Sequence, residues 1–229
     1  MLRLQAEYLL LRTRHPFIIA RGGQSDYKTV WVRLTDGDGH EGWGEAAPTK
    51  FYGETPETVM EVLQTYAQHL PADPFDLEET DRRLETALRG NPSARAALSA
   101  AMHDLVGKRL GVPVYKLWGL DPAKAPMSTF TIGIDTPERI RMKVHEAAEY
   151  PILKIKLGSD RDLEILQTIR DATDRELRVD ANCGWTVKHT IQMLPVLEEF
   201  GVTVLEQPLV PTDLEGLGVI RRAATIPLI

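Results

Sequence analysis

The sequence has little of several features that would point to a particular environment. It contains one cysteine, Cys183, which excludes an intrachain disulfide and a zinc site built from several cysteines. No stretch approaches the roughly 18 consecutive apolar residues that a membrane-spanning helix needs. Charges at Arg3, Glu7, Arg12 and Arg14 interrupt the N-terminal segment, so no cleavable signal pattern is predicted.

The charges also exclude classes of partner. The formal net charge is −6, from 27 Lys and Arg against 33 Asp and Glu, and there is no block of about five like charges. This argues against a nucleic-acid-binding surface and against a polybasic membrane patch. The 229 residues are 43% hydrophobic and 26% charged, which is typical of globular proteins. We therefore expect a soluble, cytoplasmic protein with a folded core.

Two regions with different patterns follow one another along the chain. In the first fifty residues, alternating apolar and polar positions and the turn signal Asp36–Gly39 predict antiparallel strands. Helices are predicted from the N-cap Thr55, over Leu77–Leu88, and from Pro92 to about Leu110. The last of these is rich in alanine, which indicates close packing on a neighbour. The proline-containing segment 120–126 predicts a domain junction.

From residue 126 onward, short apolar runs alternate with amphipathic segments about every 25 residues. Strand–helix alternation with short loops predicts a parallel α/β sheet. Helices are expected to open at Thr136, at Ser159-Asp160, at Thr186, and at a capping box from Thr212 to Glu215. The strands are expected at 128–134, 152–157, 177–181, 202–206 and 226–229.

Two lysines stand out in the predicted strand 152–157. Because side chains alternate between the faces of a strand, Lys154 and Lys156 share one face. In a parallel sheet covered by helices both faces should be apolar. A strand end with its lysines in solvent would also account for the pair, so this pattern alone leaves both interpretations open.

Acidic residues follow on the next two predicted strands. Asp180 comes 26 residues after Lys154, and Glu206 comes 26 residues after Asp180, so three repeats are expected to carry a polar group at the equivalent C-terminal position. Either acid alone could cap a turn or end a strand. Together they favour a catalytic site, because active sites of barrel folds lie at the C-terminal ends of the strands.

This set suits one kind of chemistry. Two carboxylates on adjacent strands, about 5 Å apart at the backbone, repel one another. A hard divalent cation resolves the repulsion, and carboxylate oxygens suit magnesium. Lys154 and the metal should together make Lys156 a usable base near neutral pH. A base facing a metal-stabilised oxyanion indicates proton abstraction next to a carboxylate.

The motifs Lys154-Ile-Lys156, Asp180-Ala-Asn182 and Glu206-Gln-Pro208 resemble the enolase superfamily, in its muconate-lactonising branch. The segments 101–108 and 111–119 are also similar to the family pattern. The resemblance implies an N-terminal α+β capping domain over residues 1–125 and a (β/α)-barrel domain from 126. Only about the first half of that barrel lies within residues 126–229, so we expect a chain truncated at its C-terminus.

Within that branch, two segments look like the mobile loops of dipeptide epimerases, Pro16–Gly22 and Gly44–Glu54. This likeness implies epimerisation of dipeptides by 1,1-proton transfer through a Mg²⁺-stabilised enediolate, in a protein that commonly forms homo-oligomers. By residue match the implied roles are as follows: Lys156 as acid/base, Lys154 as its electrostatic neighbour, Asp180 and Glu206 as metal ligands with Asn182 close by, and Arg21, Thr131, Phe51 and Tyr52 as substrate-binding residues.

Other functions remain open at this point. Relatives with the same catalytic set include o-succinylbenzoate synthase, N-succinylamino acid racemase and muconate cycloisomerase. A non-catalytic protein or an inactive fragment is a further alternative. The third metal ligand and the opposing lysine of the family are expected beyond residue 229, so we expect the 229-residue chain alone to be inactive.

Overall fold

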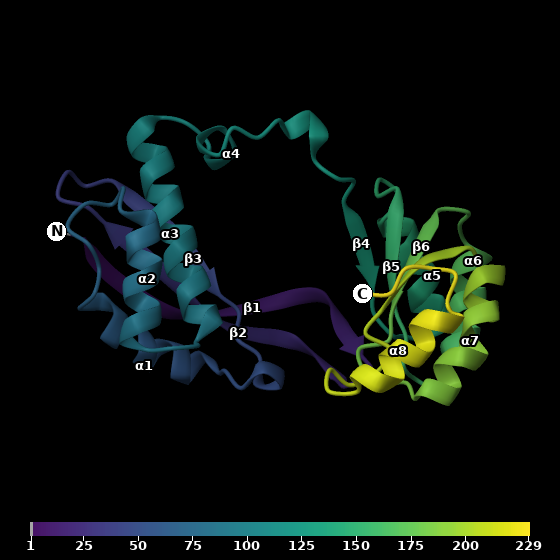
Figure 1. The fold of residues 1–229 in the computed structure, drawn as a ribbon. Coiled ribbons are helices and arrows are strands. Elements are labelled where there is room, and N and C mark those ends of the chain that lie inside the picture. Colours follow the sequence, from purple (N-terminus) through teal and green to yellow (C-terminus); the bar gives the residue numbers. More distant parts are fainter. Residues whose placement is uncertain (1) are drawn as a thin grey trace. The chain divides into compact units, whose positions relative to one another are not determined.

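The computed structural model describes residues 2–229 and divides the chain into two compact units (Figure 1). The first unit contains the residues up to Arg12 together with Asp26–Ala125, and the second contains Thr13–Ser25 together with Pro126–Ile229. Residues 13–25, which the sequence assigned to the N-terminal domain, therefore cluster with the second unit. They form the tip of a long hairpin that packs on the loops of that unit.

The first unit is built on an antiparallel sheet of order β1-β2-β3. The predicted helix start at Thr55 is confirmed, since its side chain accepts the N–H of Thr58 and Pro56 opens the helix. The other predicted helices also form where expected. The elements are β1 (Arg3–Ile19), β2 (Gly22–Thr35), β3 (Glu41–Ala46), η1 (Lys50–Tyr52), α1 (Pro56–Ala67), α2 (Leu77–Ala87), α3 (Pro92–Leu110), α4 (Val114–Leu117) and η2 (Pro122–Lys124).

Helix α3 lies directly against β3, which explains its alanine content. A Cβ atom added at Gly42 or Gly44 of β3 would overlap the backbone carbonyl oxygen of Ala101 or Ala97 of α3. Both alanines are fully buried. The close packing expected of the alanine-rich helix is therefore confirmed, and its neighbour is the glycine-containing strand β3.

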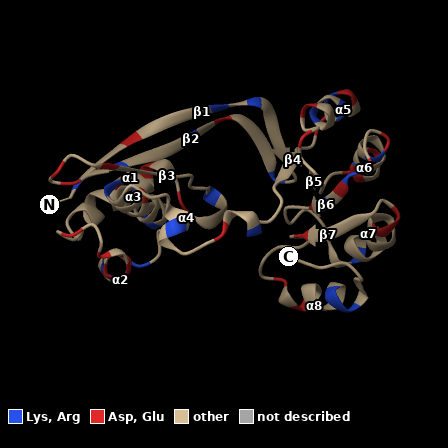
Figure 2. Cartoon of the chain, turned by 90° about the horizontal axis from the view of Figure 1, so that it is seen from above, with Lys and Arg blue, Asp and Glu red and all other residues tan. Residues whose placement is uncertain are grey.

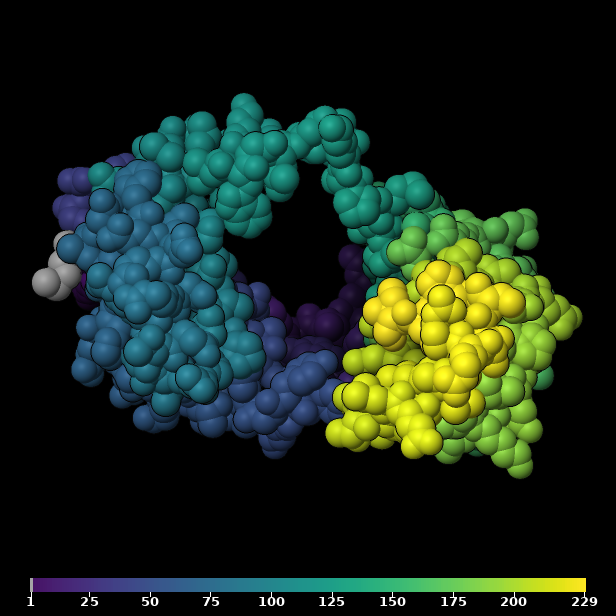
Figure 3. All heavy atoms as spheres, viewed as in Figure 1, coloured from purple at the N-terminus to yellow at the C-terminus, as the bar shows by residue number. Residues whose placement is uncertain are grey.

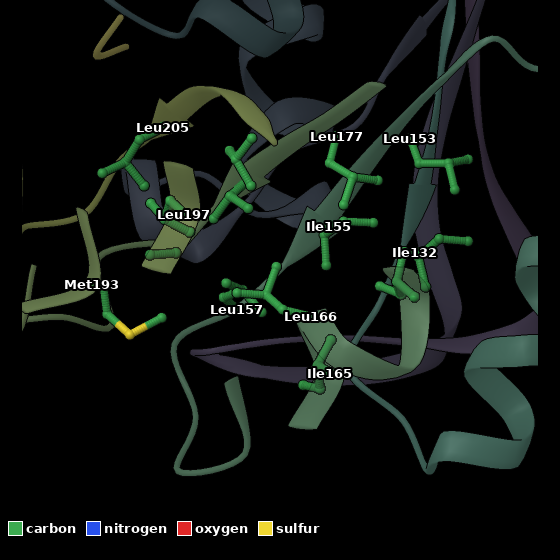
Figure 4. Close-up of a cluster of buried hydrophobic side chains, with 14 of the residues drawn as sticks. Ile132, Leu153, Ile155, Leu157, Ile165, Leu166, Leu177, Met193, Leu197 and Leu205 are labelled. Carbon is green, nitrogen blue, oxygen red and sulfur yellow. The ribbon is translucent and has the colours of Figure 1, made fainter. Parts of the chain in front are cut away.

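The second unit holds a parallel sheet of order β4-β5-β6-β7 with helices between the strands. One face of the sheet packs on these helices through a core that includes Ile155, Leu177 and Leu205 (Figure 4). The elements are β4 (Thr129–Ile132), α5 (Pro137–Glu146), β5 (Ile152–Lys156), α6 (Asp162–Arg170), β6 (Glu176–Asp180), α7 (Val187–Glu199), β7 (Val202–Glu206) and α8 (Leu214–Ala223).

The expected fold class is confirmed: an α/β chain with an antiparallel sheet in its N-terminal unit and a parallel sheet in its second unit. The segment expected as a fifth strand lies beside β7, where Leu205 N–H donates to Pro227 O and Ile229 N–H donates to Leu205 O. Together with α8 it lies on the surface of the second unit (Figure 3), and Ile229 is 72% exposed.

Two predicted helix starts are wrong. Helix α6 begins at Asp162 rather than at Ser159-Asp160, because the Asp162 carboxylate accepts the N–H groups of Gly158 and Ser159 and folds that segment into a loop. The cap of α8 is Asp213 rather than Thr212, since Asp213 accepts the N–H of Gly216.

Acidic and basic residues are interspersed along the chain in both units (Figure 2). Over residues 2–229, no helix has the length and apolar character needed to cross a membrane.

Candidate active site

The two faces of the parallel sheet differ in chemistry. Leu153, Ile155 and Leu157 face the helices and belong to the core. The alternation of the strand puts Lys154 and Lys156 on the opposite face. The lysines are not solvent-exposed strand ends, because Lys156 is only 8% exposed and Lys154 is half-buried.

Strand register aligns the predicted residues, with one correction. Lys156 is the neighbour of Asp180, and Asp180 is the neighbour of Glu206. Lys154, which the spacing of 26 aligned with Asp180, instead pairs with Arg178 on β6 and with Thr131 on β4. The residue of β6 that pairs with Lys156 comes 24 positions later in the sequence, whereas the residue of β7 that pairs with Asp180 comes 26 positions later. The pairing of β6 with β7 also contains a register shift between Leu177 and Arg178. Because side chains alternate between the faces of a strand, an alignment that differs by two residues leaves both lysines on the expected face.

The four charged groups form one connected network. Lys156 Nζ lies 2.5 Å from Asp180 Oδ2. Lys154 Nζ lies 3.2 Å from that same oxygen and 2.5 Å from Glu206 Oε2. The two carboxylates thus converge on a single cationic group, and the repulsion expected between them is neutralised by the lysines.

This network shifts the ionisation of two members. Burial raises the pKa of Asp180, but the hydrogen bonds from Lys156 and from the Asn182 N–H, together with the lysine charges, outweigh it and leave the pKa lowered. Burial lowers the pKa of Lys154, but the bond to Glu206 and the two carboxylate charges leave it raised. Asp180 is therefore an anion and Lys154 a cation in this arrangement.

The backbone adopts a left-handed conformation in the short loops that follow both carboxylates. Among residues 2–229, three of the four non-glycine residues with positive φ are Asn182 (47°), Cys183 (64°) and Gln207 (42°). Cys183 N–H donates to Gln207 O at 2.7 Å, which joins the two loops. Such conformations are uncommon outside glycine and concentrate at functional sites.

The donor set fits a magnesium ion. Asp180 and Glu206 offer carboxylate oxygens from neighbouring strand ends. The side-chain oxygen Asn182 Oδ1 is buried and has no hydrogen-bond partner among the described residues, which is rare for a buried acceptor. Hard divalent cations prefer such oxygen-rich surroundings.

Arg21 and Thr131 lie in the same unit as the network. Arg21 Nη1 donates to the backbone oxygen of Asn182 at 2.7 Å, and Asn182 N–H donates to Asp180 Oδ1 at 2.8 Å. The hairpin tip also brings the Phe17 ring to 5.9 Å from Lys156 Nζ. Thr131 is the β4 neighbour of Lys154 and is half-buried.

Phe51 and Tyr52 belong to the first unit. They lie on η1 with their rings edge to face at 4.9 Å, and Tyr52 is 66% exposed. Their role in a side-chain pocket stays a prediction.

Sequence reasoning missed several residues of the surrounding loops. Asp162, the first residue of α6, is buried and accepts a hydrogen bond from the Trp185 indole N–H at 2.7 Å, although Trp185 lies in the loop after β6. Gly158 and Gly184 both lie against Ala20 of the hairpin. One signal in the sequence could have identified Asp162. It follows the small residues Gly158 and Ser159 by a few positions, and aspartate side chains often accept hydrogen bonds from nearby backbone N–H groups in such loops.

A second group of possible ligands lies in the first unit. Ligand atoms of Asp36, Asp38 and His40 lie within 4.8 Å of one another. Asp36 accepts the N–H groups of Asp38 and His40, and Arg109 contacts both carboxylates. These groups hold the turn between β2 and β3 that the sequence predicted.

Two family models match this chain. Residues 7–119 match the mandelate racemase/muconate lactonizing enzyme N-terminal domain, and residues 138–229 match the enolase C-terminal domain-like family. The chain is 39% identical over 220 residues to an L-Ala-D/L-Glu epimerase from Bacteroides thetaiotaomicron, covering 95% of this chain and 57% of the relative. It thus spans little more than half the length of that curated relative.

Two solved structures are also similar. A dipeptide epimerase from Cytophaga hutchinsonii, complexed with Mg and D-Ala-L-Val, superposes with a TM-score of 0.90 at 27% identity, covering 98% of this chain and 63% of the other. An N-succinyl Arg/Lys racemase from Bacillus cereus gives 0.90 at 26%, covering 98% and 64%. With its two domain matches covering most of its length, the chain belongs to the mandelate racemase/muconate lactonizing enzyme family of the enolase superfamily and is similar to its dipeptide epimerases.

Proposed function

We propose that the protein containing this chain is a magnesium-dependent dipeptide epimerase that acts by 1,1-proton transfer. One observation carries the proposal: Lys156, Asp180 and Glu206 are direct neighbours at the C-terminal ends of three successive parallel strands. Catalytic groups of barrel enzymes lie at this end of the strands. The substrate is a small dipeptide, as the names of several relatives suggest.

Asp180 and Glu206 would hold Mg²⁺, with the unpartnered Asn182 oxygen beside them. When bound, the ion supplies the positive charge that stabilises an enediolate, which makes the weakly acidic α-proton of the C-terminal residue removable. The two lysines would then no longer be the main counter-charges of the carboxylates.

Lys156 would accept the α-proton at Nζ from one face of the substrate. Its side chain is 10% exposed, and Lys154 lies beside it as an electrostatic neighbour on the same face of β5. Lys154 would act as this electrostatic neighbour without itself taking the proton. Return of a proton on the opposite face requires a second base, which this proposal does not assign to a residue of the chain.

Substrate contacts would come from the hairpin and from β4. Arg21 offers a guanidinium that matches the geometry of a substrate carboxylate, and it already lies beside the loop after Asp180. Thr131 would line the site. Phe51 and Tyr52 would shape the side-chain pocket.

A second candidate is an N-succinylamino acid racemase. The solved racemase has the same TM-score as the dipeptide epimerase, so the fold alone does not separate the two reactions. Both need the same base and metal ligands. Likewise, o-succinylbenzoate synthase and muconate cycloisomerase remain alternatives with this catalytic set.

Deuterium incorporation separates the dipeptide epimerase from the N-succinylamino acid racemase. The whole protein is incubated with Mg²⁺ in D₂O with L-Ala-L-Glu, a hydrophobic dipeptide or an N-succinylamino acid, and α-proton exchange is followed by NMR. We expect exchange with at least one dipeptide. Exchange with the N-succinylamino acid alone would favour the racemase, and exchange with none of the three would contradict the proposal.

A further inference from the structure

The loops after β5 and β6 are tied together by one buried carboxylate. Asp162, 4% exposed, accepts hydrogen bonds from four donors: Gly158 N–H, Ser159 N–H, Ser159 Oγ–H and Trp185 Nε1–H, at 2.7 to 3.0 Å. Three donors belong to the loop after β5, which carries the lysines. The fourth belongs to the loop after β6, which carries Asp180. Neither loop can move without breaking bonds to the other.

The same two loops form a seat for the hairpin tip. A Cβ at Gly158 would lie 2.6 Å from Ala20 Cβ, and a Cβ at Gly184 would lie 2.8 Å from it. Ala20 therefore packs against two backbone positions that admit no side chain. Gly158 also has a φ of +100°, which other residues rarely adopt. Asp162 bonds to both the loop of Gly158 and the loop of Gly184, and so joins the two sides of this seat.

The seat sets the position of Arg21. Arg21 directly follows Ala20, and its guanidinium donates to Asn182 O on the loop after β6. Phe17 of the same hairpin tip has its ring 5.9 Å from Lys156 Nζ. Displacement of the seat would move the group proposed to meet the substrate carboxylate, while the ion pairs of Lys156 and Asp180 would remain.

We propose that Asp162 is a positioning residue, which locks the two loops as a seat for Ala20 and thereby places Arg21 for substrate binding. This inference rests on the proposed function for its kinetic consequence, but not for its structural one. Asp162 touches neither the lysines nor the carboxylates directly in the contacts described above. Its effect should therefore fall on substrate binding more than on the chemical step.

The test uses Asp162→Asn in the whole protein, with Asp160→Asn as the matched control. The Asp162→Asn change keeps the shape of the side chain but turns an NH₂ group toward N–H donors, so at least one donor loses its acceptor. Asp160 is exposed and precedes Asp162 by two residues. Trp185→Phe, which removes one of the four donors and keeps an aromatic ring, serves as a second variant if Asp162→Asn does not fold.

Two readouts are measured. Amide hydrogen exchange in residues 13–25 should rise about tenfold in Asp162→Asn, less in Trp185→Phe, and not in Asp160→Asn. With L-Ala-L-Glu, KM should rise about tenfold with kcat changed less than about threefold. Asp162→Asn should add little to the KM of Arg21→Ala, because both changes remove the same interaction.

The outcomes distinguish a positioning role of Asp162 from a purely structural one. Unchanged exchange in residues 13–25 overturns the positioning role, as does a lowered melting temperature with unchanged KM, which would show a purely structural role. Full additivity with Arg21→Ala also overturns it. If the wild-type protein exchanges no dipeptide, the proposed function fails, and the amide exchange alone then decides the role of Asp162.

Discussion

At the scale of single residues, the polar groups of the parallel sheet are the informative ones. Lys154 and Lys156 interrupt a strand that is otherwise apolar, and both pair with the Asp180 carboxylate of the neighbouring strand β6. Their positions could be predicted from the sequence because side-chain alternation depends only on local geometry. Their ion-pair partners depend on register, which the sequence defined less well.

A buried ion pair at the start of α5 gives a test of stability. Asp135 accepts from Lys143 at 2.8 Å and from Arg139 at 3.0 Å, with the Asp135 and Lys143 side chains 11% and 6% exposed. Asp135→Asn leaves Lys143 buried without its counter-charge, so we expect a loss of about 3 kcal/mol of unfolding free energy at pH 7. Urea unfolding measures it, and Asp160→Asn should change little.

The same pair predicts a pH dependence. Burial raises the pKa of Asp135, but the contacts with Lys143, the Thr136 N–H and Arg139 outweigh it and leave the pKa lowered. A lowered folded-state pKa gives stability that is fully present above the unfolded value of about 4 and is lost as the pH falls through the folded value. The difference between wild type and Asp135→Asn should therefore shrink below about pH 4. A constant difference down to about pH 2 would contradict this.

Asp162 shows where residue-level prediction stopped. Its partner Trp185 is 23 residues away in the loop after β6, and no periodic pattern in the sequence predicts such a contact. The sequence instead favoured Ser159-Asp160 as the helix start, because small polar residues are good N-caps. The buried carboxylate of Asp162 provides more hydrogen bonds to that segment than a cap would.

At the scale of elements, the contact between α3 and β3 is the tightest test of packing. Gly44→Ala places a methyl group on the carbonyl of Ala97, and we expect a loss of about 3 kcal/mol of unfolding free energy. Gly37→Ala is the control, since a Cβ there meets nothing within 4 Å, and its effect should stay within about 0.5 kcal/mol. Equal effects of the two changes would contradict this packing.

Helix α8 tests the corrected cap. Asp213→Ala removes the acceptor for Gly216 N–H and should cost about 1 kcal/mol, measured by urea unfolding. Thr212→Ala should be nearly neutral. A larger loss of stability in Thr212→Ala than in Asp213→Ala would contradict the corrected cap and favour the capping box predicted at Thr212.

Element prediction succeeded where signals are local and failed where strands must be aligned. Thr55, Pro92 and Gly111 mark helix ends through their own side chains or φ angles, and the helices start and stop there. The interval of 26 residues misaligned Lys154, because the number of residues between strands also includes loop lengths and the register shift at Leu177/Arg178.

At the scale of the whole molecule, the chain spans 57% of the length of its curated relative from Bacteroides thetaiotaomicron. We expect a polypeptide of these 229 residues alone to be inactive, because 1,1-proton transfer needs bases on both faces of the substrate and the proposed site supplies Lys156 on one. A preparation with a verified mass of 25.7 kDa is assayed for α-proton exchange beside the whole protein. Epimerase activity in the short polypeptide would refute this expectation.

The central claim is that Lys156 is the base that removes the α-proton. Lys156→Arg keeps the positive charge beside Asp180 but cannot act as a base near neutral pH, because an arginine stays protonated. Lys188→Arg, at an exposed position of α7, is the matched control. The deciding measurement is α-proton exchange of L-Ala-L-Glu and of L-Ala-D-Glu in D₂O with Mg²⁺, because each base removes the proton of one epimer. We predict exchange of both epimers in the wild type and in Lys188→Arg, and a loss of at least about a thousandfold for one of the two epimers in Lys156→Arg. Exchange of both epimers at the wild-type rate in Lys156→Arg would contradict the claim.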